Sequence, residues 1–326
     1  MSTTAFPSGS LLLLALVFAI VTGANDGGAI LTMGLRIPSL RPLGAIVVLT
    51  LGVTFAPLLF GVHVAETFAK RLVGFDSGDG RTAFVIGLCA ALAVVAVLTR
   101  SGLPTSLTLA LIGGITGAGL GYGLSVAWRS VLTVLAFGVV APIVGGLVGL
   151  GLARALQVLP ASRGVTRAAH WATQLGYAVQ GLAYGANDGQ KMLAVFAVTG
   201  ATGGRLTVRP SGESLVAIGC CFAIGTVLSM RRLAGRLGRD LLVVRPIHAL
   251  SAELASSAAV FGSAAAGMPV SMTQSIAGAL VGAGVSESSR RVRWRAVMRL
   301  AMAWAVTLPA TVAVAFAAAV VARLIR

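Results

Sequence analysis

Long apolar stretches, separated by short and mostly basic segments, make up nearly the whole chain. A helix needs about 20 predominantly apolar residues to cross the hydrocarbon core of a bilayer. The pattern therefore predicts a membrane protein built of helices, with loops too short to hold a separate soluble domain. Ten apolar elements are expected, at about 9–33, 42–61, 82–98, 103–121, 130–152, 168–199, 212–230, 248–266, 269–285 and 297–322.

Two short motifs each occur twice along the chain. Gly-Ala-Asn-Asp is found at 23–26 and again at 185–188, and Gly-Leu-Pro-Thr-Ser-Leu-Thr at 102–108 is matched by Gly-Met-Pro-Val-Ser-Met-Thr at 267–273. The nearly equal offsets of the two pairs indicate two related halves of about five elements each. An odd number of crossings inverts the second half relative to the first. We therefore expect an all-α polytopic membrane protein with two inverted repeats.

The repeats predict a division of the chain into three parts. Residues 1–152 form the first transmembrane repeat, 153–167 a basic cytoplasmic linker, and 168–326 the second, inverted transmembrane repeat. The fourth element of each half, 103–121 and 269–285, is short and interrupted by proline and glycine. Each of these two elements either crosses the membrane or re-enters as a hairpin, so broken or re-entrant helices are expected near the midplane.

Composition and charge agree with a membrane protein and argue against nucleic acid as a partner. Only 10% of the 326 residues are charged, whereas soluble domains carry about 25%. The net charge of +16 comes from arginines in short loops, where they set topology and contact anionic membrane lipid. Most of these arginines fall in loops on one side of the ten-element arrangement. The positive-inside rule makes that side cytoplasmic and places both termini outside.

The doubled Gly-Ala-Asn-Asp motif places a carboxylate in each of two apolar elements. One carboxylate at the bilayer centre costs about 2.5–3.5 kcal/mol, so two in matched positions indicate that both are used. Gly23 and Gly185 weaken the helix beside them. Unwound carbonyls, together with Asp26 and Asp188, would form a hard oxygen site for a coupling Na⁺ or H⁺. The alternative is a helix–helix contact through small residues.

Two further buried charges are candidates for chemistry. Glu253 lies in an apolar element among serines, where it would bind a cation or relay a proton; alternatively, neighbouring hydroxyls satisfy its carboxylate. Lys191 lies one to two helical turns from Asp188. It would reach either a bound anion or Asp188 itself, as a structural ion pair.

The fourth elements predict an anion site. Pro104 and Pro269 each precede a Ser-x-Thr, and proline is favoured in the first turn of a helix. The free amides of the first helical turn and the hydroxyls of Ser106, Thr108, Ser271 and Thr273 would form a donor-rich pocket at a positive dipole end. Such a pocket suits a compact oxyanion. The alternative is ordinary N-capping of a membrane helix.

These motifs resemble those of the inorganic phosphate transporter (PiT) family over essentially the full chain. The family carries Gly-Ala-Asn-Asp twice, each followed by Pro-Val/Ile-Ser-Thr-Thr-His. The first half here has Pro-Thr-Ser-Leu-Thr-Leu at 104–109, and the second has Asn-Asp-Gly-Gln-Lys at 187–191 and Pro-Val-Ser-Met-Thr-Gln at 269–274. Leu107 and Met272 replace the first family threonine, and Leu109 and Gln274 replace the histidines.

The resemblance implies a symporter and not an enzyme. It would import inorganic phosphate, coupled to Na⁺ or H⁺ by alternating access, in the plasma membrane of a bacterium, with no cofactor beyond a bound Na⁺. Asn-Asp and Ser-Thr groups from both halves would form its site. The implied phosphate ligands are Ser106, Thr108, Ser271, Thr273, Asn25, Asn187, Gln190 and Lys191, and the implied coupling-ion ligands are Asp26, Asp188, Glu253, Gly23 and Gly185.

Other functions stay open at this stage. Sulfate or a metal–phosphate complex would suit similar donors, and a channel or a homodimer would fit the same composition. A different class is an intramembrane aspartyl protease that uses Asp26 and Asp188. Against the protease, an asparagine precedes each aspartate in a glycine-rich segment.

Overall fold

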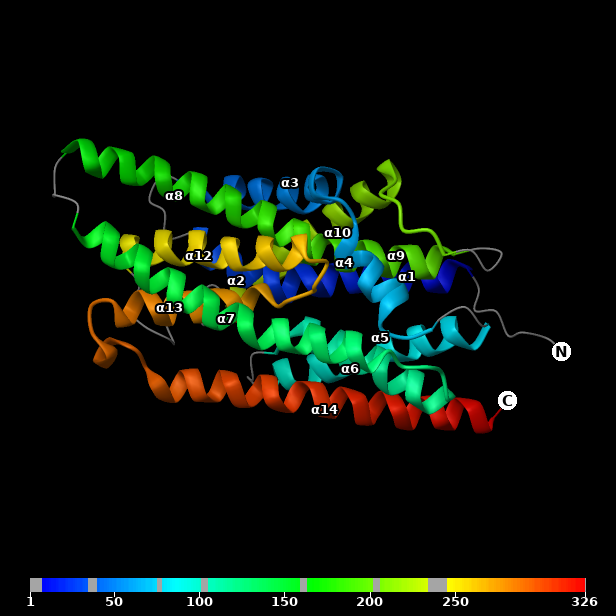
Figure 1. Cartoon of the computed structure of the whole chain (residues 1–326). Helices are drawn as coiled ribbons and strands as arrows, with labels where there is room; N and C mark the ends of the chain where they lie inside the picture. The colour runs from blue at the N-terminus through cyan, green and yellow to red at the C-terminus, as the bar shows by residue number, and fades with distance from the viewer. Residues whose placement is uncertain are drawn as a thin grey trace.

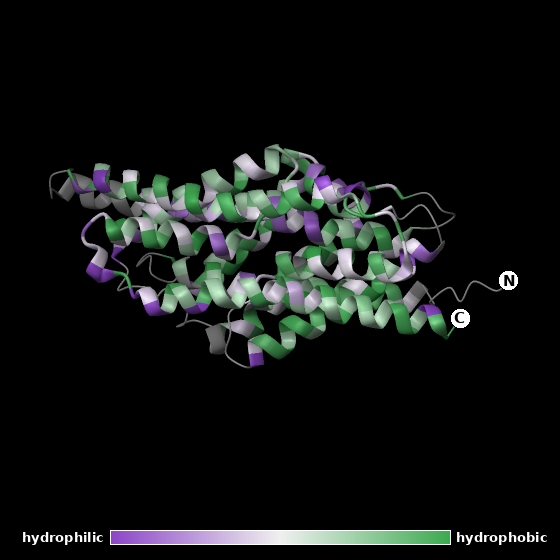
Figure 2. Cartoon of the chain, turned by 60° about the horizontal axis from the view of Figure 1, so that its bottom comes forward, coloured by the Kyte–Doolittle hydropathy of each residue, from purple (hydrophilic) through white to green (hydrophobic). Residues whose placement is uncertain are grey.

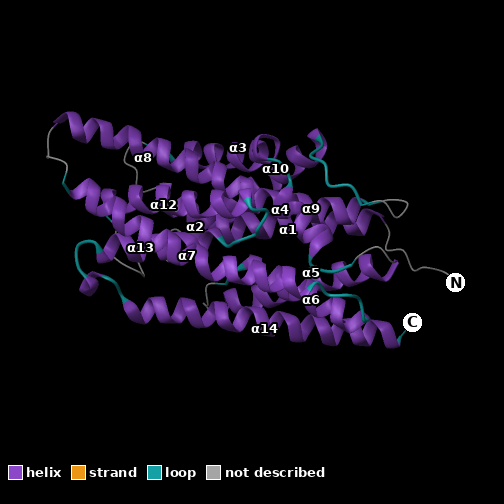
Figure 3. Ribbon diagram, viewed as in Figure 1, coloured by secondary structure: helices purple, strands orange, loops and turns teal. Residues whose placement is uncertain are grey.

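The computed structural model describes residues 8–34, 40–74, 78–100, 105–158, 163–201, 206–233 and 245–325. Helices dominate these ranges, and no β-strand occurs in them (Figure 3). The helices are α1 (Ser8–Thr22), α2 (Gly28–Gly34), α3 (Pro42–Phe60), α4 (His63–Glu66), α5 (Gly78–Arg100), α6 (Leu107–Tyr122), α7 (Trp128–Gln157), α8 (Arg163–Tyr184), α9 (Gln190–Gly200), α10 (Gly212–Leu233), α12 (Pro246–Ala265), α13 (Met272–Val285) and α14 (Trp294–Leu324). Each of the ten predicted elements contains a helical segment, but Gly61, 105–106, Ala266 and 269–271 lie outside the helices.

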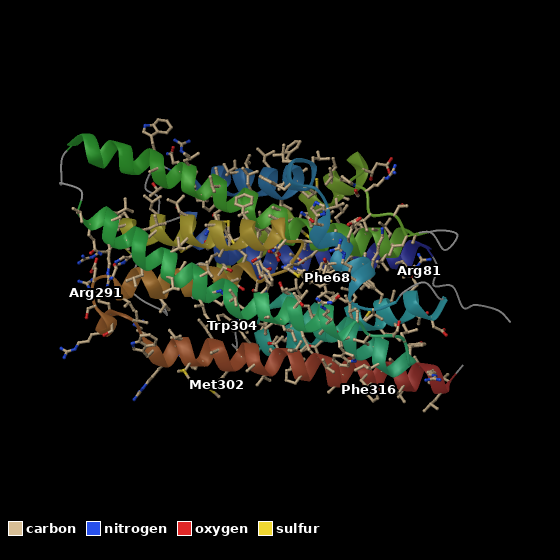
Figure 4. All side chains as sticks on the ribbon, in the orientation of Figure 1. Phe68, Arg81, Arg291, Met302, Trp304 and Phe316 are labelled. Atoms are coloured by element: carbon tan, nitrogen blue, oxygen red, sulfur yellow. The ribbon has the colours of Figure 1, made fainter. Side chains whose placement is uncertain are left out.

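The chain is a multi-pass membrane protein by the length and composition of its helices. Within the described ranges, six stretches are long and apolar enough to cross a bilayer. They are Gly9–Leu31, Pro42–Phe60, Asp79–Arg100, Trp128–Gln157, Gly212–Met230 and Trp294–Leu324. Many strongly polar residues gather toward the two ends of the bundle (Figure 2). Met302 and Phe316 of α14 project outward along its length (Figure 4), as a lipid-facing helix requires.

Helices α12 and α13 form a hairpin that turns back near the middle of the bundle (Figure 1). Gly267 closes the turn with φ of 69°, a backbone conformation that favours glycine. The element expected at 269–285 therefore turns back beside α12, as a re-entrant element would. Its counterpart α6 packs on α5 and has 16 residues, so it is about 24 Å long, short of the roughly 30 Å hydrocarbon core.

The two halves of the chain interlock through matched glycine contacts. Gly113 and Gly117 of α6 lie against the backbone of α14, and Gly278 and Gly282 of α13 lie against the backbone of α7. A Cβ on any of the four would collide with a main-chain oxygen of the facing helix. The two pairs are offset by 165 residues (113 to 278), close to the offset of the duplicated motifs. Each short helix thus packs on the last long helix of the other half.

One helical segment was missed in the sequence pattern. Residues 62–71 were expected to be loop, but α4 and the π-helical turn η2 (Thr67–Arg71) form there. Gly61, with φ of 78°, ends α3 and lets the chain turn into α4. Apolar residues Val64, Ala65, Phe68, Ala69 and Leu72 then follow at helical spacing, and all five are buried. Glu66, at the end of α4, lies 4.0 Å from Lys70 and 3.8 Å from Arg71.

Several sequence predictions fall outside the described residues. Pro104 is one, as are 159–162 of the basic linker and 234–244 of the arginine-rich run that follows α10. The described parts of 153–167 belong to the ends of α7 and α8. Arg291 lies at one end of the bundle and Arg81 toward the other, the end at which the termini lie (Figure 4). In the ten-element arrangement, Arg81 precedes the third element and Arg291 precedes the tenth, so alternating crossings also place these two arginines on opposite sides.

Candidate functional site

The two Gly-Ala-Asn-Asp motifs adopt the same local structure. Each forms one π-helical turn, η1 at Gly23–Gly27 and η3 at Gly185–Gly189, between two α-helical segments. We expected the glycines to interrupt the helix here, and they do. In a π-helical turn each hydrogen bond spans one residue more than in an α-helix, but the backbone stays helical. The motif is therefore a bulge within a helix and not an open, unwound loop. Single π-helical turns inside α-helices are rare and occur frequently at functional sites.

The glycines of both turns also serve close helix packing. A Cβ on Gly23 would collide with the main-chain oxygen of Phe222 in α10, and one on Gly185 with that of Gly52 in α3. The helix–helix contact considered as an alternative is therefore present. It occurs together with buried carboxylates, so the two interpretations of the motif do not exclude each other.

Asp26 is buried and receives only neutral donors. Its Oδ1 accepts a hydrogen bond of 2.7 Å from Nδ2 of Asn25, and its Oδ2 accepts one of 3.4 Å from the hydroxyl of Tyr184. No Lys, Arg or His in the described ranges forms an ion pair with Asp26. Tyr184 directly precedes the second motif. The carboxylate of the first motif is thus hydrogen-bonded to the helix that carries the second.

Asp188, by contrast, is paired with a cation. Its Oδ1 lies 2.6 Å from Nζ of Lys191, and the side chains of both residues are almost fully buried. The ammonium also donates to Oγ1 of Thr108 at 2.6 Å and to the main-chain oxygen of Val270 at 2.5 Å. Thr108 belongs to the first half and Val270 to the second, so Lys191 ties the starts of α6 and α13 together.

The two short helices meet at their starts, as one shared anion pocket would require. Oγ1 of Thr108 donates to the main-chain oxygen of Val270 at 3.3 Å. Ser106 caps α6, because its Oγ accepts from the amide of Leu109 at 3.3 Å. Ser271 makes no such cap bond; its Oγ lies 2.9 Å from Oγ1 of Thr273. The two helix starts therefore differ, with capping at α6 and a pair of buried hydroxyls at α13.

Glu253 is buried inside α12, and no described residue donates to either carboxylate oxygen. Ser256 and Ser257 donate to its main-chain oxygen, so they do not satisfy the carboxylate as the alternative required. A Cβ on Gly176 of α8 would lie 2.9 Å from Oε2. Glu253 thus faces α8, the helix that leads into the second motif.

Besides the carboxylate of Glu253, other buried polar atoms on the same and neighbouring elements have no partner in the described ranges. They are both side-chain polar atoms of Asn187, Oδ2 of Asp188, Oγ1 of Thr105, Oγ of Ser251 and Oε1 of Gln180. Leaving a buried polar group unpaired costs about 1–3 kcal/mol, so native proteins keep few of them. Their concentration on η3, α8, α12 and the start of α6 marks these elements as a candidate binding region.

Gln190 has a structural role that its sequence position did not reveal. Its Oε1 accepts from the amides of Val64 and Ala65 at 2.8 and 3.3 Å, which caps the first turn of α4. Thr67 of η2 in turn donates to the main-chain oxygen of Gly267 at 2.7 Å. The short α4–η2 segment therefore holds the turn between α12 and α13 against the second motif.

Comparison with known proteins gives the family. The phosphate transporter family matches residues 22–178 and 162–315. The chain belongs to this family. A probable low-affinity inorganic phosphate transporter of Rhizobium meliloti (strain 1021) is 29% identical over 323 residues, covering 95% of each chain. A probable low-affinity inorganic phosphate transporter of Mycobacterium leprae (strain TN) is 31% identical, over 90% of this chain and 73% of the relative.

The fold of this family member also matches a solved structure. The structure described as the sodium-dependent phosphate transporter aligns with a TM-score of 0.78 and 18% identity, covering 96% of this chain and 98% of that one. At this identity the likeness shows the fold. Membership of the phosphate transporter family confirms the resemblance and makes the chain a transporter and not an enzyme. The aspartyl protease alternative is therefore wrong.

Proposed function

We propose that this chain imports inorganic phosphate across the plasma membrane of a bacterium by symport with Na⁺ or H⁺. The observation that carries the proposal is the meeting of both halves at one buried polar region. There, Thr108 of the first half contacts Lys191 and Val270 of the second, and Lys191 also binds Asp188. Asp26 of the first half is in turn hydrogen-bonded by Tyr184 of the second. Family membership and the names of the relatives support phosphate as the substrate.

The anion would bind between the two short helices. Amides at the starts of α6 and α13 carry the positive end of each helix dipole, which favours a compact anion. Ser271 and Thr273 bring buried hydroxyls there, and Asn187 brings an amide whose polar atoms have no other partner in the described ranges. Serine, threonine and asparagine side chains can all donate to phosphate oxygens. Ser106 and Asn25 complete the proposed set.

The coupling cation would bind at the carboxylates without a cationic partner. Among the described residues, Asp26 accepts from Asn25 and Tyr184 alone, and Glu253 has no donor. An ionised carboxylate in a dry interior needs a counter-ion or a proton. A cation there would also offset the charge of the phosphate, so that both ligands bind better together than either does alone.

The halves 1–152 and 168–326 would act as inverted repeats that rock against each other. The matched glycine packing of α6 on α14 and of α13 on α7 supports this division. So does the short hairpin of α12 and α13, since helices broken near the midplane are typical of such transporters. The apolar side chains exposed on α3, α7 and α14 would face membrane lipid.

Uptake of labelled phosphate into proteoliposomes tests the substrate. The full chain should give saturable uptake that excess unlabelled phosphate and arsenate suppress strongly and sulfate suppresses weakly. Arsenate matches phosphate in charge and protonation, whereas sulfate carries no proton at neutral pH. Empty liposomes and liposomes with the Asp26→Asn variant are the controls. Equal suppression by sulfate and phosphate would show that the substrate is a broader class of oxyanions. Absence of saturable uptake would refute the proposal.

A further inference from the structure

The ammonium of Lys191 is enclosed by three oxygen atoms from three segments of the chain. They are Oδ1 of Asp188 at 2.6 Å, Oγ1 of Thr108 at 2.6 Å and the main-chain oxygen of Val270 at 2.5 Å. A lysine ammonium has three donors, so all three are used inside the protein. The side chain of Lys191 is only 4% exposed. In this arrangement Lys191 has no donor left for a phosphate oxygen.

These oxygens are the kinds that proteins present to hard metal cations. A carboxylate, a hydroxyl and a main-chain carbonyl occur together in oxygen-ligand sites for such ions, and transporters bind Na⁺ with similar groups. The hydroxyl of Thr108 turns a lone pair to the ammonium because its own proton points to Val270. The hydroxyl oxygen of Thr108 therefore faces the ammonium of Lys191 with a lone pair, as it would face a metal ion. The pocket is therefore built for a positive charge.

The first half has the same carboxylate without the lysine. An offset of 162 residues (23 to 185) matches Asp26 with Asp188 and Ala29 with Lys191. Ala29 is buried and carries no charge. Within the part of the chain that the structure describes, Asp26 receives hydrogen bonds from two neutral donors, Asn25 and Tyr184. The copies also differ at Gly28 and Gln190, but Lys191 is the difference in charge: the second copy carries a covalently attached cation beside its aspartate, and the first does not.

We propose that Lys191 is a built-in cation that occupies the cation site of Asp188. The exchangeable coupling cation then binds only at the carboxylates that lack a lysine, with Asp26 as the counterpart site. The statement about the coupling cation rests on the proposed function. The statement about Lys191 and Asp188 concerns the protein without any transported ligand. As a consequence, the protein would transport one cation fewer with each phosphate than a variant with a neutral residue at position 191.

Direct binding of radioactive Na⁺ to the purified full chain, without phosphate, tests the first statement. Lys191→Ala leaves the three oxygens in place and removes the ammonium. This variant should bind one more Na⁺ ion per chain than the wild type does. The added site should vanish in Lys191→Ala/Asp188→Asn, which lacks the carboxylate. Lys70→Ala, which removes a lysine with a 45% exposed side chain on η2, is the control and should bind as the wild type does.

The same number of bound Na⁺ ions in Lys191→Ala and the wild type would overturn the proposal. If Lys191→Ala does not yield folded protein, Lys191→Ala/Asp188→Asn decides the question, because it removes both charges. The proposal expects that double variant to fold without added Na⁺. A double variant that also fails would show that the lysine is needed for packing and not as a cation. Since phosphate takes no part, neither result bears on whether the chain transports phosphate.

Discussion

The hydroxyl of Tyr184 lies 3.4 Å from Oδ2 of Asp26, so the residue before the second motif contacts the carboxylate of the first. This contact brings two segments that are 158 positions apart in sequence into one buried site. It also shows how the duplicated aspartates differ. Asp26 is held by neutral groups, whereas Asp188 is held by the ammonium of Lys191.

Asp188→Asn should destabilise the protein by about 3–5 kcal/mol, the cost of removing one partner of a buried ion pair. The variant leaves the buried ammonium of Lys191 without its counter-charge. Thermal unfolding in detergent, followed by circular dichroism, measures the loss. Adding Lys191→Met should restore most of the stability, since a neutral pair of similar volume is tolerated. A double variant no more stable than Asp188→Asn alone would show that the charge pair is not what stabilises this region.

Ser271→Ala should weaken phosphate binding more than it weakens the fold. A lost hydrogen bond to a charged ligand costs about 1.5–3 kcal/mol, which is on the order of tenfold to over a hundredfold in affinity. Ser106→Ala should in addition lower stability by about 1 kcal/mol, because it removes the cap of α6. Calorimetric titration of purified protein with phosphate measures the affinity.

Ser275→Ala is the matched control for the anion site. Its hydroxyl lies one turn further into α13 and donates to the main-chain oxygen of Ser271. Its removal should leave phosphate affinity within about twofold of the wild type, as expected for a group that does not touch the ligand. Unchanged affinity in both Ser271→Ala and Ser106→Ala would remove these helix starts from the site.

Gln190 was predicted to bind phosphate, and its contacts give a way to separate that role from capping. Gln190→Glu keeps an acceptor for the amides of Val64 and Ala65, and so should fold, with some loss of stability because its carboxylate is buried. Gln190→Leu should lower stability by about 1–3 kcal/mol, because the two buried amides lose their acceptor. Equal stability of Gln190→Leu and the wild type would show that the cap is dispensable. Phosphate affinity measured in Gln190→Glu then reports whether a negative charge here repels the ligand.

Gly117→Ala and Gly282→Ala should be destabilising to a similar extent, by about 1–3 kcal/mol, through overpacking. The added methyl group would meet the backbone of Val312 in the first case and of Gly146 in the second. Gly151→Ala, where no atom lies within 4 Å of the added carbon, is the control. Thermal unfolding of the three variants compares them directly. A stable Gly282→Ala beside an unstable Gly117→Ala would contradict matched packing in the two halves.

The apolar pattern predicted the long helices and the interruption at each Gly-Ala-Asn-Asp motif. The reason is physical: spans need long apolar runs, and glycine clusters weaken a helix locally. The short α4 escaped notice because the pattern after Gly61 covers barely two turns. The close packing of α6 on α14 followed from no local signal, since Gly113 and Gly117 acquire it only by contact with a distant helix.

The sequence named candidate site residues by their type, but it gave none of the contacts that they make. Sequence alone placed Asp188 and Lys191 within reach of each other, and left open whether the lysine pairs or binds an anion. Only the fold shows Thr108 and Val270 completing its coordination, because they lie 83 and 79 residues away. The same holds for Gln190, whose amide partners are about 125 residues distant. Local spacing carries no information on such contacts.

The most direct test of the account is phosphate accumulation driven by an imposed ion gradient in proteoliposomes. The wild-type chain should concentrate labelled phosphate inside above the outside level under an inward Na⁺ or H⁺ gradient, and an ionophore that collapses that gradient should abolish the excess. Asp26→Asn, which keeps the size of the side chain and removes its charge, should fold and insert normally but show no accumulation. Accumulation by Asp26→Asn equal to that of the wild type, with the same ion dependence, would contradict the account.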